Sequence, residues 1–252
     1  VEELYEHGYC ETGRDCARVA IESGLDIEMG SSVYASYLPE LVRTGVVSEE
    51  RLDEAVLRVL ELKNKLDMYE NPDRFTDIQK RDEVTLSESG RALSRRAVEE
   101  GSVLLKNDGV LPLKESAKIA LVGPFADEHE IIGNWAGKGR IEESVTVKEG
   151  VESLLQKNVP YERGCSWKLF ETDESGFEEA EHICAQADMI VACVGEHMMN
   201  SGEAHSRADI RIPEIQRKFI MRLHELEKPL VLVVFGGRPL GLSEIEEFAD
   251  AI

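Results

Sequence analysis

Three short runs of consecutive apolar residues constrain the fold of this chain more than any other feature of its sequence. They cover residues 119–122, 189–194 and 230–235, and segments with helical periodicity lie between them. A strand that faces water on one side alternates apolar and polar residues, whereas a strand buried on both faces is continuously apolar. The runs therefore predict an α/β fold in which helices cover both faces of a mostly parallel sheet.

The segments between and beside these runs predict the covering helices and one further strand. We expect helices over 148–157 and 174–187, a helix opened by Pro213, and a further strand over 159–162. In open parallel sheets, ligands bind at the carboxyl ends of the strands. The loops at 123–140, 195–212 and 236–241 should therefore gather at one edge of the sheet.

The first part of the chain has a different pattern, with helical periodicity in place of long apolar runs. Helical periodicity predicts helices over 12–23, 34–44 and 48–66, with Ser48 as the N-cap of the last, and residues 25–29 suggest a short strand. These elements have no obvious core of their own, so we expect them to need a partner. The apolar faces of 12–23 and 48–66 predict self-association into a homo-oligomer or disorder if the piece is made alone.

A break after the third of these helices suggests a domain boundary. Asn71-Pro72-Asp73 ends the helical pattern, and the polar stretch 74–87 leads into a further predicted helix over 87–100. We therefore divide the chain into a first region over 1–72, a linker over 73–98 and an α/β domain over 99–252.

Charge and cysteine content exclude several classes of function. The 29 basic and 50 acidic residues give a net charge of −21, which disfavours nucleic-acid and anionic membrane partners. No apolar run approaches the roughly 20 residues of a membrane helix. The five cysteines contain no CxxC pair, so neither a disulfide framework nor a metal site is predicted, and Cys184 and Cys193 are expected in the core. We expect no cofactor.

The loop that follows residues 189–194 is the richest in titratable groups. Glu203 lies between Gly202 and Ala204, so a substrate could approach its carboxyl closely, and partial burial would suit it to donate a proton. The alternative is a solvated loop whose acids balance Arg207 and Arg211. His197 and His205 flank this segment, but their spacing is weak evidence for a metal, and hydrogen-bonded histidines are favoured.

A second glycine-containing loop, residues 133–139, carries Trp135. A phosphate-binding role fails because the loop has neither a Walker lysine context nor GxGxxG at a strand end, which also counts against a nucleotide-binding domain. Trp135 could instead stack on the C–H face of a pyranose, or it could be structural. Both interpretations of Trp135 stay open.

Several segments together resemble one known family. Residues 201–213 (SGEAHSRADIRIP) resemble the acid/base segment of bacterial β-glucosidases of glycoside hydrolase family 3. Residues 101–113, 120–124 and 188–196 resemble the opening of that family's second domain, its first strand and the strand before the acid loop. His7-Gly8, residues 23–29 and residues 37–39 resemble the last part of its first domain. The resemblance covers nearly the whole chain in the family's order.

The resemblance implies a (β/α)8-like barrel followed by a six-stranded α/β sandwich. It implies a retaining double displacement, in which an Asp of the barrel attacks the anomeric carbon and Glu203 protonates the leaving oxygen and then activates water. Retention requires the two carboxyls about 5–5.5 Å apart. The family's nucleophile lies in a Ser-Asp-aromatic phrase just ahead of the segment that matches residues 1–4, and this phrase is absent from the chain.

We therefore expect an internal piece of a retaining, exo-acting β-glycosidase of the β-glucosidase type. It would combine the C-terminal remnant of the barrel with most of the sandwich, and by itself it should not hydrolyse glycosides. The expected substrates are β-linked oligosaccharides or aryl and alkyl glycosides, with xylosidase or N-acetylglucosaminidase activity as alternatives. The alternative from another class is a non-catalytic domain that binds carbohydrate or a partner.

The resemblance also suggests substrate-binding residues. Met29 would line the sugar pocket at the end of the last barrel strand, or else pack in the barrel. Trp135 would form an aromatic wall of the acceptor site. Arg207 would orient Glu203 or pair with Asp209, and the pairing is favoured. Glu196 is the second candidate proton donor. For location, we expect the cytoplasm rather than secretion or the periplasm.

Overall fold

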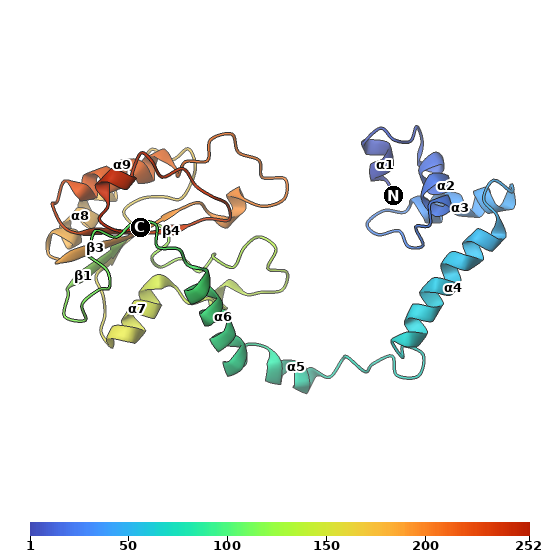
Figure 1. Ribbon diagram of the computed structural model, residues 1–252, viewed down its shortest axis with the longest axis horizontal. Coiled ribbons are helices and arrows are strands. Elements are labelled where there is room, and N and C mark those ends of the chain that lie inside the picture. Colours follow the sequence, from blue (N-terminus) through green and yellow to red (C-terminus); the bar gives the residue numbers. More distant parts are fainter. The chain divides into compact units, whose positions relative to one another are not determined.

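The computed structural model describes residues 1–252, which form two compact units, Val1–Glu100 and Gly101–Ile252. Unit 1 is helical, and unit 2 contains a parallel sheet with helices on both faces (Figure 1). The α/β fold with a parallel sheet, predicted from the three apolar runs, is confirmed in unit 2.

Unit 1 has its core between α2 and α3, which pack against each other. The six helices are α1 (Glu3–Glu6), α2 (Gly13–Glu22), α3 (Val33–Arg43), α4 (Glu49–Lys65), α5 (Ile78–Val84) and α6 (Glu88–Gly101). The core residues are Cys10, Cys16, Ala17, Ile21, Val33, Leu38, Leu41, Val47 and Ala55. The region therefore has a small core, where the sequence pattern suggested none, and its need for a partner stays a prediction.

Helix α4 begins where the sequence predicts. The Ser48 hydroxyl accepts a hydrogen bond from the backbone N–H of Arg51, which satisfies one of the unpaired donors of the first turn. Ala55 is the one buried residue of this helix. The apolar side chains of Val56, Leu57, Leu60 and Leu62 are exposed. Self-association of the chain stays a prediction.

The short strand predicted over 25–29 does not form. A strand needs a neighbour to pair its backbone groups, and unit 1 contains no other strand. Side chains hold this segment instead. Asp26 accepts hydrogen bonds from Arg51 and Arg58 of α4, and Glu28 accepts from the backbone N–H groups of Val33 and Tyr34 at 3.0 and 2.6 Å.

Helices α5 and α6 lie in and beyond the predicted linker. Asp77 caps α5 by accepting a hydrogen bond from the N–H of Lys80, and α6 matches the helix predicted over 87–100. The polar stretch before α6 is therefore partly helical. The assignments of 1–72, 73–98 and 99–252 as separate parts stay predictions.

Unit 2 contains a four-stranded parallel sheet in the order β2-β1-β3-β4. The strands are β1 (Ile119–Val122), β2 (Tyr161–Glu162), β3 (Met189–Gly195) and β4 (Leu230–Phe235). The principal helices are α7 (Val147–Leu155), α8 (Phe177–Ala185) and α9 (Glu214–His224). β1, β3 and β4 are the three apolar runs that predicted the sheet.

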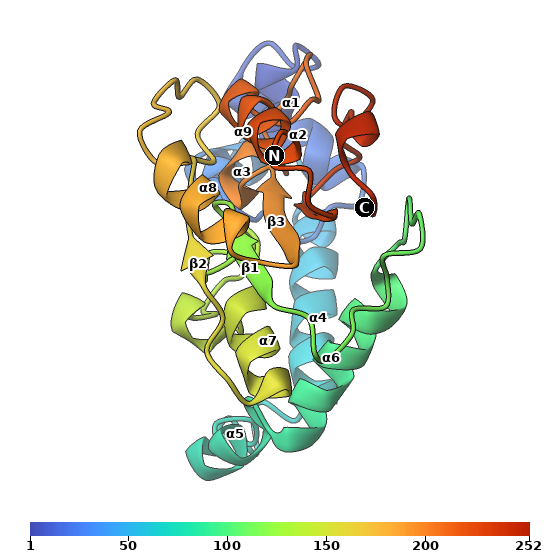
Figure 2. The same ribbon diagram turned by 90° about the vertical axis from the view of Figure 1, so that its left-hand side faces the viewer.

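The alternation of side chains across the strands produces two cores, one on each face of the sheet. Ala120, Ile190 and Ala192 pack with α8 and α9, whereas Leu121 and Val191 pack on the face that α7 covers. Figures 1 and 2 show α8 and α9 on one side of the strands and α7 on the other. Both faces are therefore covered, which explains why the strands are continuously apolar.

The predicted six-stranded sheet is not confirmed, because the structure forms four strands. Beyond β4, Ala251 makes an isolated parallel bridge with Val231 and an antiparallel bridge with Asn107. The backbone N–H of Leu105 also donates to the carbonyl of Ile252 at 2.8 Å. These two segments continue the pairing outwards from β4, but each pairs over too few residues to form a strand.

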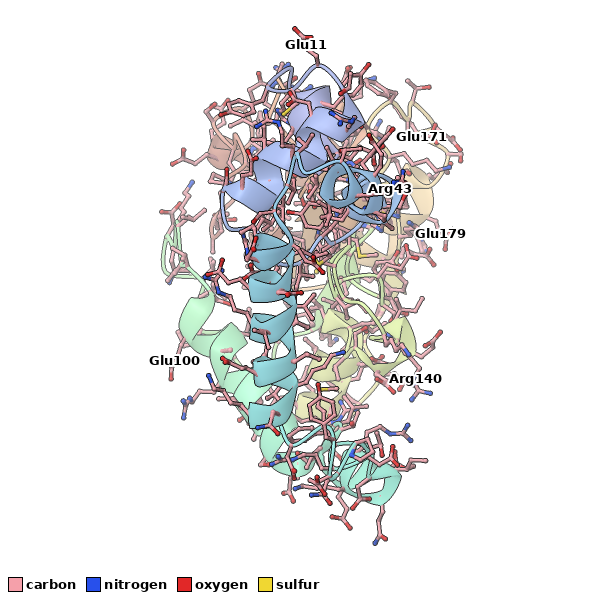
Figure 3. The ribbon with its side chains drawn as sticks, turned by 90° about the vertical axis from the view of Figure 1, so that its right-hand side faces the viewer. Glu11, Arg43, Glu100, Arg140, Glu171 and Glu179 are labelled. Atoms are coloured by element: carbon pink, nitrogen blue, oxygen red, sulfur yellow. The ribbon has the colours of Figure 1, made fainter.

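Glu11 and Glu100 are among the acidic residues at the surface, whereas the thiols lie inside. Figure 3 shows the side chains of Glu11 and Glu100 pointing away from the ribbon. All five cysteines are free and buried, and the predicted core positions of Cys184 and Cys193 are confirmed. None of the helices combines the length and the apolar character needed to cross a membrane.

Candidate active site

The carboxyl ends of β1, β3 and β4 bring three loops to one edge of the sheet. Val122 pairs with Ala192 and Gly195 pairs with Phe235, so the chain leaves neighbouring strands close together. Gly195 has a φ of +134°, and a Cβ there would lie 1.9 Å from the carbonyl oxygen of Phe235. The end of β3 can therefore approach β4 this closely because residue 195 has no side chain.

Glu203 lies at the tip of a tight turn in the loop after β3. The backbone N–H of His205 donates to the carbonyl of Gly202 at 3.2 Å, and both Gly202 and Ala204 have positive φ values, +106° and +61°. A positive φ is uncommon for a residue with a side chain, so the turn is held in a conformation that costs free energy. The turn leaves the Glu203 side chain exposed.

Arg238, from the loop after β4, brackets this turn. Its Nη2 donates to the carbonyl of Asn200 at 2.6 Å and to the carbonyl of His205 at 2.7 Å. These two carbonyls lie on either side of Glu203 in the sequence. One guanidinium therefore fixes both ends of the segment that presents the glutamate.

Glu196 is buried beneath the loop and is bound by two arginines. Its Oε1 accepts from Nη1 of Arg207 at 2.7 Å, and its Oε2 accepts from Nε of Arg238 at 3.1 Å. The Glu196 side chain is 0% exposed. Because both oxygens are paired and covered, the structure does not support Glu196 as the second candidate proton donor.

The loop over 133–139 contacts the same turn. Nδ2 of Asn134 donates to the carbonyl of Ser201 at 3.0 Å, and a Cβ on Gly202 would lie 2.8 Å from that nitrogen. Trp135 follows Asn134 and is 75% exposed. The loop therefore braces the turn through Asn134 and leaves the indole of Trp135 free to contact a ligand.

His197 is a buried, hydrogen-bonded residue. Its ring stacks on that of Trp167 with centroids 3.8 Å apart, and its Nε2 lies 3.1 Å from Oε2 of Glu130. Its Nδ1 accepts from the backbone N–H of Met199. Both nitrogens are therefore engaged, and His197 anchors the start of the loop that carries Glu203.

The far end of the loop is fixed by a surface ion-pair network. Arg211 donates to both carboxyl oxygens of Asp209 and also binds Glu244, which in turn pairs with Arg217. Hydrogen bonds from the side chain and the backbone N–H of Arg211 hold the pKa of Asp209 well below its usual range. Asp209 therefore pairs with Arg211 and not with Arg207, contrary to the favoured interpretation of the sequence.

The remaining predicted site residues have different surroundings. Met29 belongs to unit 1, is 91% exposed and lies in the irregular segment after α2. Arg207 is occupied by Glu196 and by the carbonyl of Arg211 at 3.1 Å. The substrate-binding roles of Met29, Trp135 and Arg207 stay predictions.

Neither of the two residues that brace the turn was predicted from the sequence. Arg238 is 42 positions from Glu196, and Asn134 is 67 positions from Ser201. One signal for Arg238 is present in the sequence, because it follows two glycines at the carboxyl end of a predicted strand. Such an arginine is a reasonable candidate for a contact with the neighbouring strand-end loop.

Comparisons with known proteins match this chain to one family. Residues 102–252 match the family model described as the glycosyl hydrolase family 3 C-terminal domain. The periplasmic β-glucosidase of Salmonella typhimurium is 35% identical over 100% of this chain and 36% of its own length. An exo-1,4-β-xylosidase of Emericella nidulans is 34% identical over 92% of the chain and 30% of its own length.

A solved structure gives the same picture. The crystal structure of a β-glucosidase from Listeria innocua in complex with laminaribiose superposes with a TM-score of 0.90 at 36% identity. The match covers 99% of this chain and 34% of that one. The chain therefore spans about a third of the length of the relatives that it matches.

The comparison with the Salmonella relative also corrects the expected location. That relative is a periplasmic protein. The cytoplasmic location expected from the sequence is therefore wrong on this comparison.

Proposed function

This chain belongs to glycosyl hydrolase family 3, and we propose that it supplies the general acid/base, Glu203, of a retaining, exo-acting β-glycosidase. The full-length enzyme would release terminal non-reducing sugars from β-linked oligosaccharides or from aryl and alkyl glycosides. Relatives named β-glucosidase and xylosidase support β-glucosides as the first substrates to test and β-xylosides as the second.

In the proposed reaction, protons and electron pairs balance over two steps. A nucleophilic carboxylate attacks the anomeric carbon while the carboxylic acid of Glu203 gives its proton to the departing glycosidic oxygen. The Glu203 carboxylate then takes a proton from water, whose oxygen attacks the same carbon and releases the nucleophile. We assign none of the acidic residues in 1–252 as the nucleophile.

The observation that carries this proposal is the way in which the Glu203 turn is held. Two carbonyl oxygens of the turn are bound by Arg238 and a third by Asn134, and the carboxyl at its tip has no competing ion pair. A proton donor needs a fixed approach to the leaving oxygen and a surface that substrate can reach. The turn provides both, because its backbone is held at three carbonyls and the Glu203 side chain is exposed.

The test is the dependence of Glu203→Gln on the leaving group in the full-length enzyme. General acid help is worth about 10²–10⁴-fold, and a good leaving group needs little of it. We expect kcat/KM to fall by about that factor for alkyl glycosides and far less for dinitrophenyl glycosides. Azide should accelerate the variant by replacing water, and it should give a glycosyl azide of retained configuration.

Glu196→Gln gives a comparison within the same loop. It removes a buried carboxylate that pairs with Arg207 and Arg238. It therefore tests whether the loss of any negative charge from this loop produces the leaving-group dependence expected for Glu203→Gln. The proposal for Glu203 would be overturned if Glu203→Gln slowed activated and unactivated glycosides equally, or if azide acted on Glu196→Gln instead.

The substrate contacts are proposed from two exposed side chains, Trp135 of unit 2 and Met29 of unit 1. The free indole of Trp135, next to Asn134, would stack on the sugar in the acceptor site, and Met29 would line the sugar pocket. The same exposure of Trp135 favours the alternative of a carbohydrate-binding domain without catalysis. Calorimetry with laminaribiose distinguishes the two, because that alternative requires binding to survive in Glu203→Gln while hydrolysis by the wild type is absent.

We also propose the larger architecture that the family implies. Residues 1–72 would be the C-terminal remnant of a (β/α)8-like barrel, 73–98 a linker and 99–252 the α/β sandwich. The pairing of 250–252 with β4, and of 105–108 with 250–252, supports two further strands at this edge of the sheet. These two segments would bring the sheet to six strands.

A further inference from the structure

We propose that Arg238 is a positioning residue that fixes the orientation of Glu203, which it does not touch. This inference rests on the proposed role of Glu203 as the proton donor. Apart from Asn134, which binds the carbonyl of Ser201 alone, little else holds the turn. Residues 201–204 belong to no helix or strand, and one internal hydrogen bond, from His205 to Gly202, closes the turn.

Arg238 supplies the missing restraints from outside the turn. Its single Nη2 atom joins the carbonyl of Asn200, three residues before Glu203, to that of His205, two residues after it. Joining both flanks to one planar group removes the freedom of the turn to tilt as a whole. Any change in the place of the guanidinium therefore moves the Glu203 carboxyl.

The guanidinium is itself held rigidly. Glu196 binds its Nε from below, and the Glu196 side chain is fully covered and fixed on its other oxygen by Arg207. Next to Arg238, Gly237 lies so close to Ser201 that a Cβ would be 2.2 Å from the serine Oγ. The loop after β4 therefore packs against Ser201 through Gly237 and binds the backbone on both sides of Glu203 through Arg238.

Arg207 provides a comparison that separates the effect of the two carbonyl hydrogen bonds of Arg238 from the effect of its ion pair with Glu196. It binds the same carboxylate at 2.7 Å, but its second contact is the carbonyl of Arg211, outside the turn. The two arginines thus share Glu196 and differ in what they hold. If the ion pair alone mattered, replacing either arginine would have the same kinetic effect.

The experiment compares Arg238→Lys with Arg207→Lys and Arg217→Lys in the full-length enzyme. Lysine keeps the positive charge near Glu196, but its one ammonium replaces a planar group whose Nε holds Glu196 while its Nη2 holds the two carbonyls. Arg217 pairs with Glu244 at the far end of the loop and has the same 20% exposure as Arg238. It binds neither Glu196 nor a carbonyl next to Glu203, so Arg217→Lys controls for the loss of a partly covered arginine ion pair.

We expect Arg238→Lys to lower kcat for alkyl glycosides by about 10²-fold, since a misplacement of about 1 Å has an effect of that size. KM for alkyl glycosides and kcat/KM for dinitrophenyl glycosides should change little. Arg207→Lys should show a smaller dependence on the leaving group, and Arg217→Lys none. In the 252-residue chain, Arg238→Lys should also speed amide hydrogen exchange in 201–205.

A second variant disturbs the contact between the loop after β4 and the turn without changing a charged residue. Gly237→Ala pushes Ser201 away from the loop after β4, so it should reproduce the leaving-group dependence of Arg238→Lys. The inference is overturned if Arg238→Lys and Arg207→Lys have equal effects, or if Arg238→Lys slows all leaving groups alike. It is also overturned if neither Arg238→Lys nor Gly237→Ala folds, since the role would then be one of stability.

Glu203→Gln, assayed beside these variants, separates this inference from the proposed function. If Glu203→Gln shows no leaving-group dependence, the proposed function fails whatever Arg238→Lys does. If Glu203→Gln shows it and Arg238→Lys does not, the proposed function stands and the positioning role of Arg238 fails.

Discussion

Gln216 of α9 binds both backbone groups of Gly195 at the end of β3. Its Oε1 accepts from the N–H of Gly195 at 2.7 Å, and its Nε2 donates to the carbonyl of the same residue at 3.0 Å. The Gln216 side chain is fully buried. A helix thus fixes the backbone one residue before Glu196, from which the bracing of the Glu203 turn begins.

Replacing Gln216 by Leu should destabilise unit 2 by about 2–6 kcal/mol. The leucine has a similar volume but leaves two buried backbone groups unpaired, each at a cost of about 1–3 kcal/mol. Both tryptophans, Trp135 and Trp167, lie in unit 2, so their fluorescence during urea unfolding reports on this unit alone.

The matched control for this prediction is Gln186→Leu. Gln186 is exposed and follows α8, where its amide contacts His182. We expect the free energy of unfolding of Gln186→Leu to stay within about 0.5 kcal/mol of the wild-type value. Equal effects of the two substitutions would show that Gln216 does not hold Gly195.

Replacing Gly195 by Ala should destabilise unit 2 by more than about 3 kcal/mol, because the methyl group would overlap the carbonyl of Phe235 and the φ of +134° disfavours any side chain. Gly150 is the control. It lies inside α7 with no atom within 4 Å of an added Cβ, so Gly150→Ala should stabilise by about 0.5–1 kcal/mol. Tryptophan-monitored unfolding of both variants would test the opposite signs.

The sequence predicts the centre of the sheet well and its edges poorly, for a physical reason. β1, β3 and β4 are buried on both faces, and burial leaves a continuous apolar run that can be recognised locally. Residues 25–29 also alternate apolar and polar side chains, yet no strand pairs with them, and Asp26 and Glu28 bind α4 and α3 instead. Strand formation depends on a neighbour that a local pattern does not reveal.

The candidate site divides in the same way. Glu203 stands out because glycine and alanine flank it in a loop after a predicted strand. Its supports, Arg238 and Asn134, come from other loops, and their hydrogen bonds end on backbone carbonyls that every residue carries. The sequence pattern favoured a pair between Arg207 and Asp209, but Arg207 binds Glu196. Glu196 is available because it is buried beside Arg207, and its burial follows from the packing of the whole unit.

The buried thiols should resist modification in the folded chain. Burial raises the pKa of Cys184 and of Cys193 to about 12, so almost none of either thiol is ionised at pH 8, and thiolate is the reactive form. We expect neither residue to react with iodoacetamide within an hour at pH 8, as measured by peptide mass spectrometry. In guanidinium chloride both should react fully, and rapid labelling of native Cys193 would contradict the placement of β3 in the core.

Acid should loosen the start of α3 through Glu28. Burial raises the pKa of this carboxyl, but hydrogen bonds from Ser31 and from the N–H groups of Tyr34 and Val33 outweigh burial and lower the pKa below 4.5. A lowered folded-state pKa means that the ionised form stabilises the fold. That stabilisation is complete above about pH 4.5 and is lost as the pH falls through the folded-state value.

The amide resonances of Val33 and Tyr34 should therefore titrate together, with a midpoint below 4.5, and Glu28→Gln should abolish that titration. Glu11→Gln is the control, since Glu11 is an exposed acid outside this cluster. Glu28→Gln should lower the stability of unit 1 at pH 7, and by much less once the pH has fallen below the folded-state pKa, where the native carboxyl is protonated as well. A midpoint above 4.5 would mean that burial outweighs the hydrogen bonds, and that Glu28 does not secure α3.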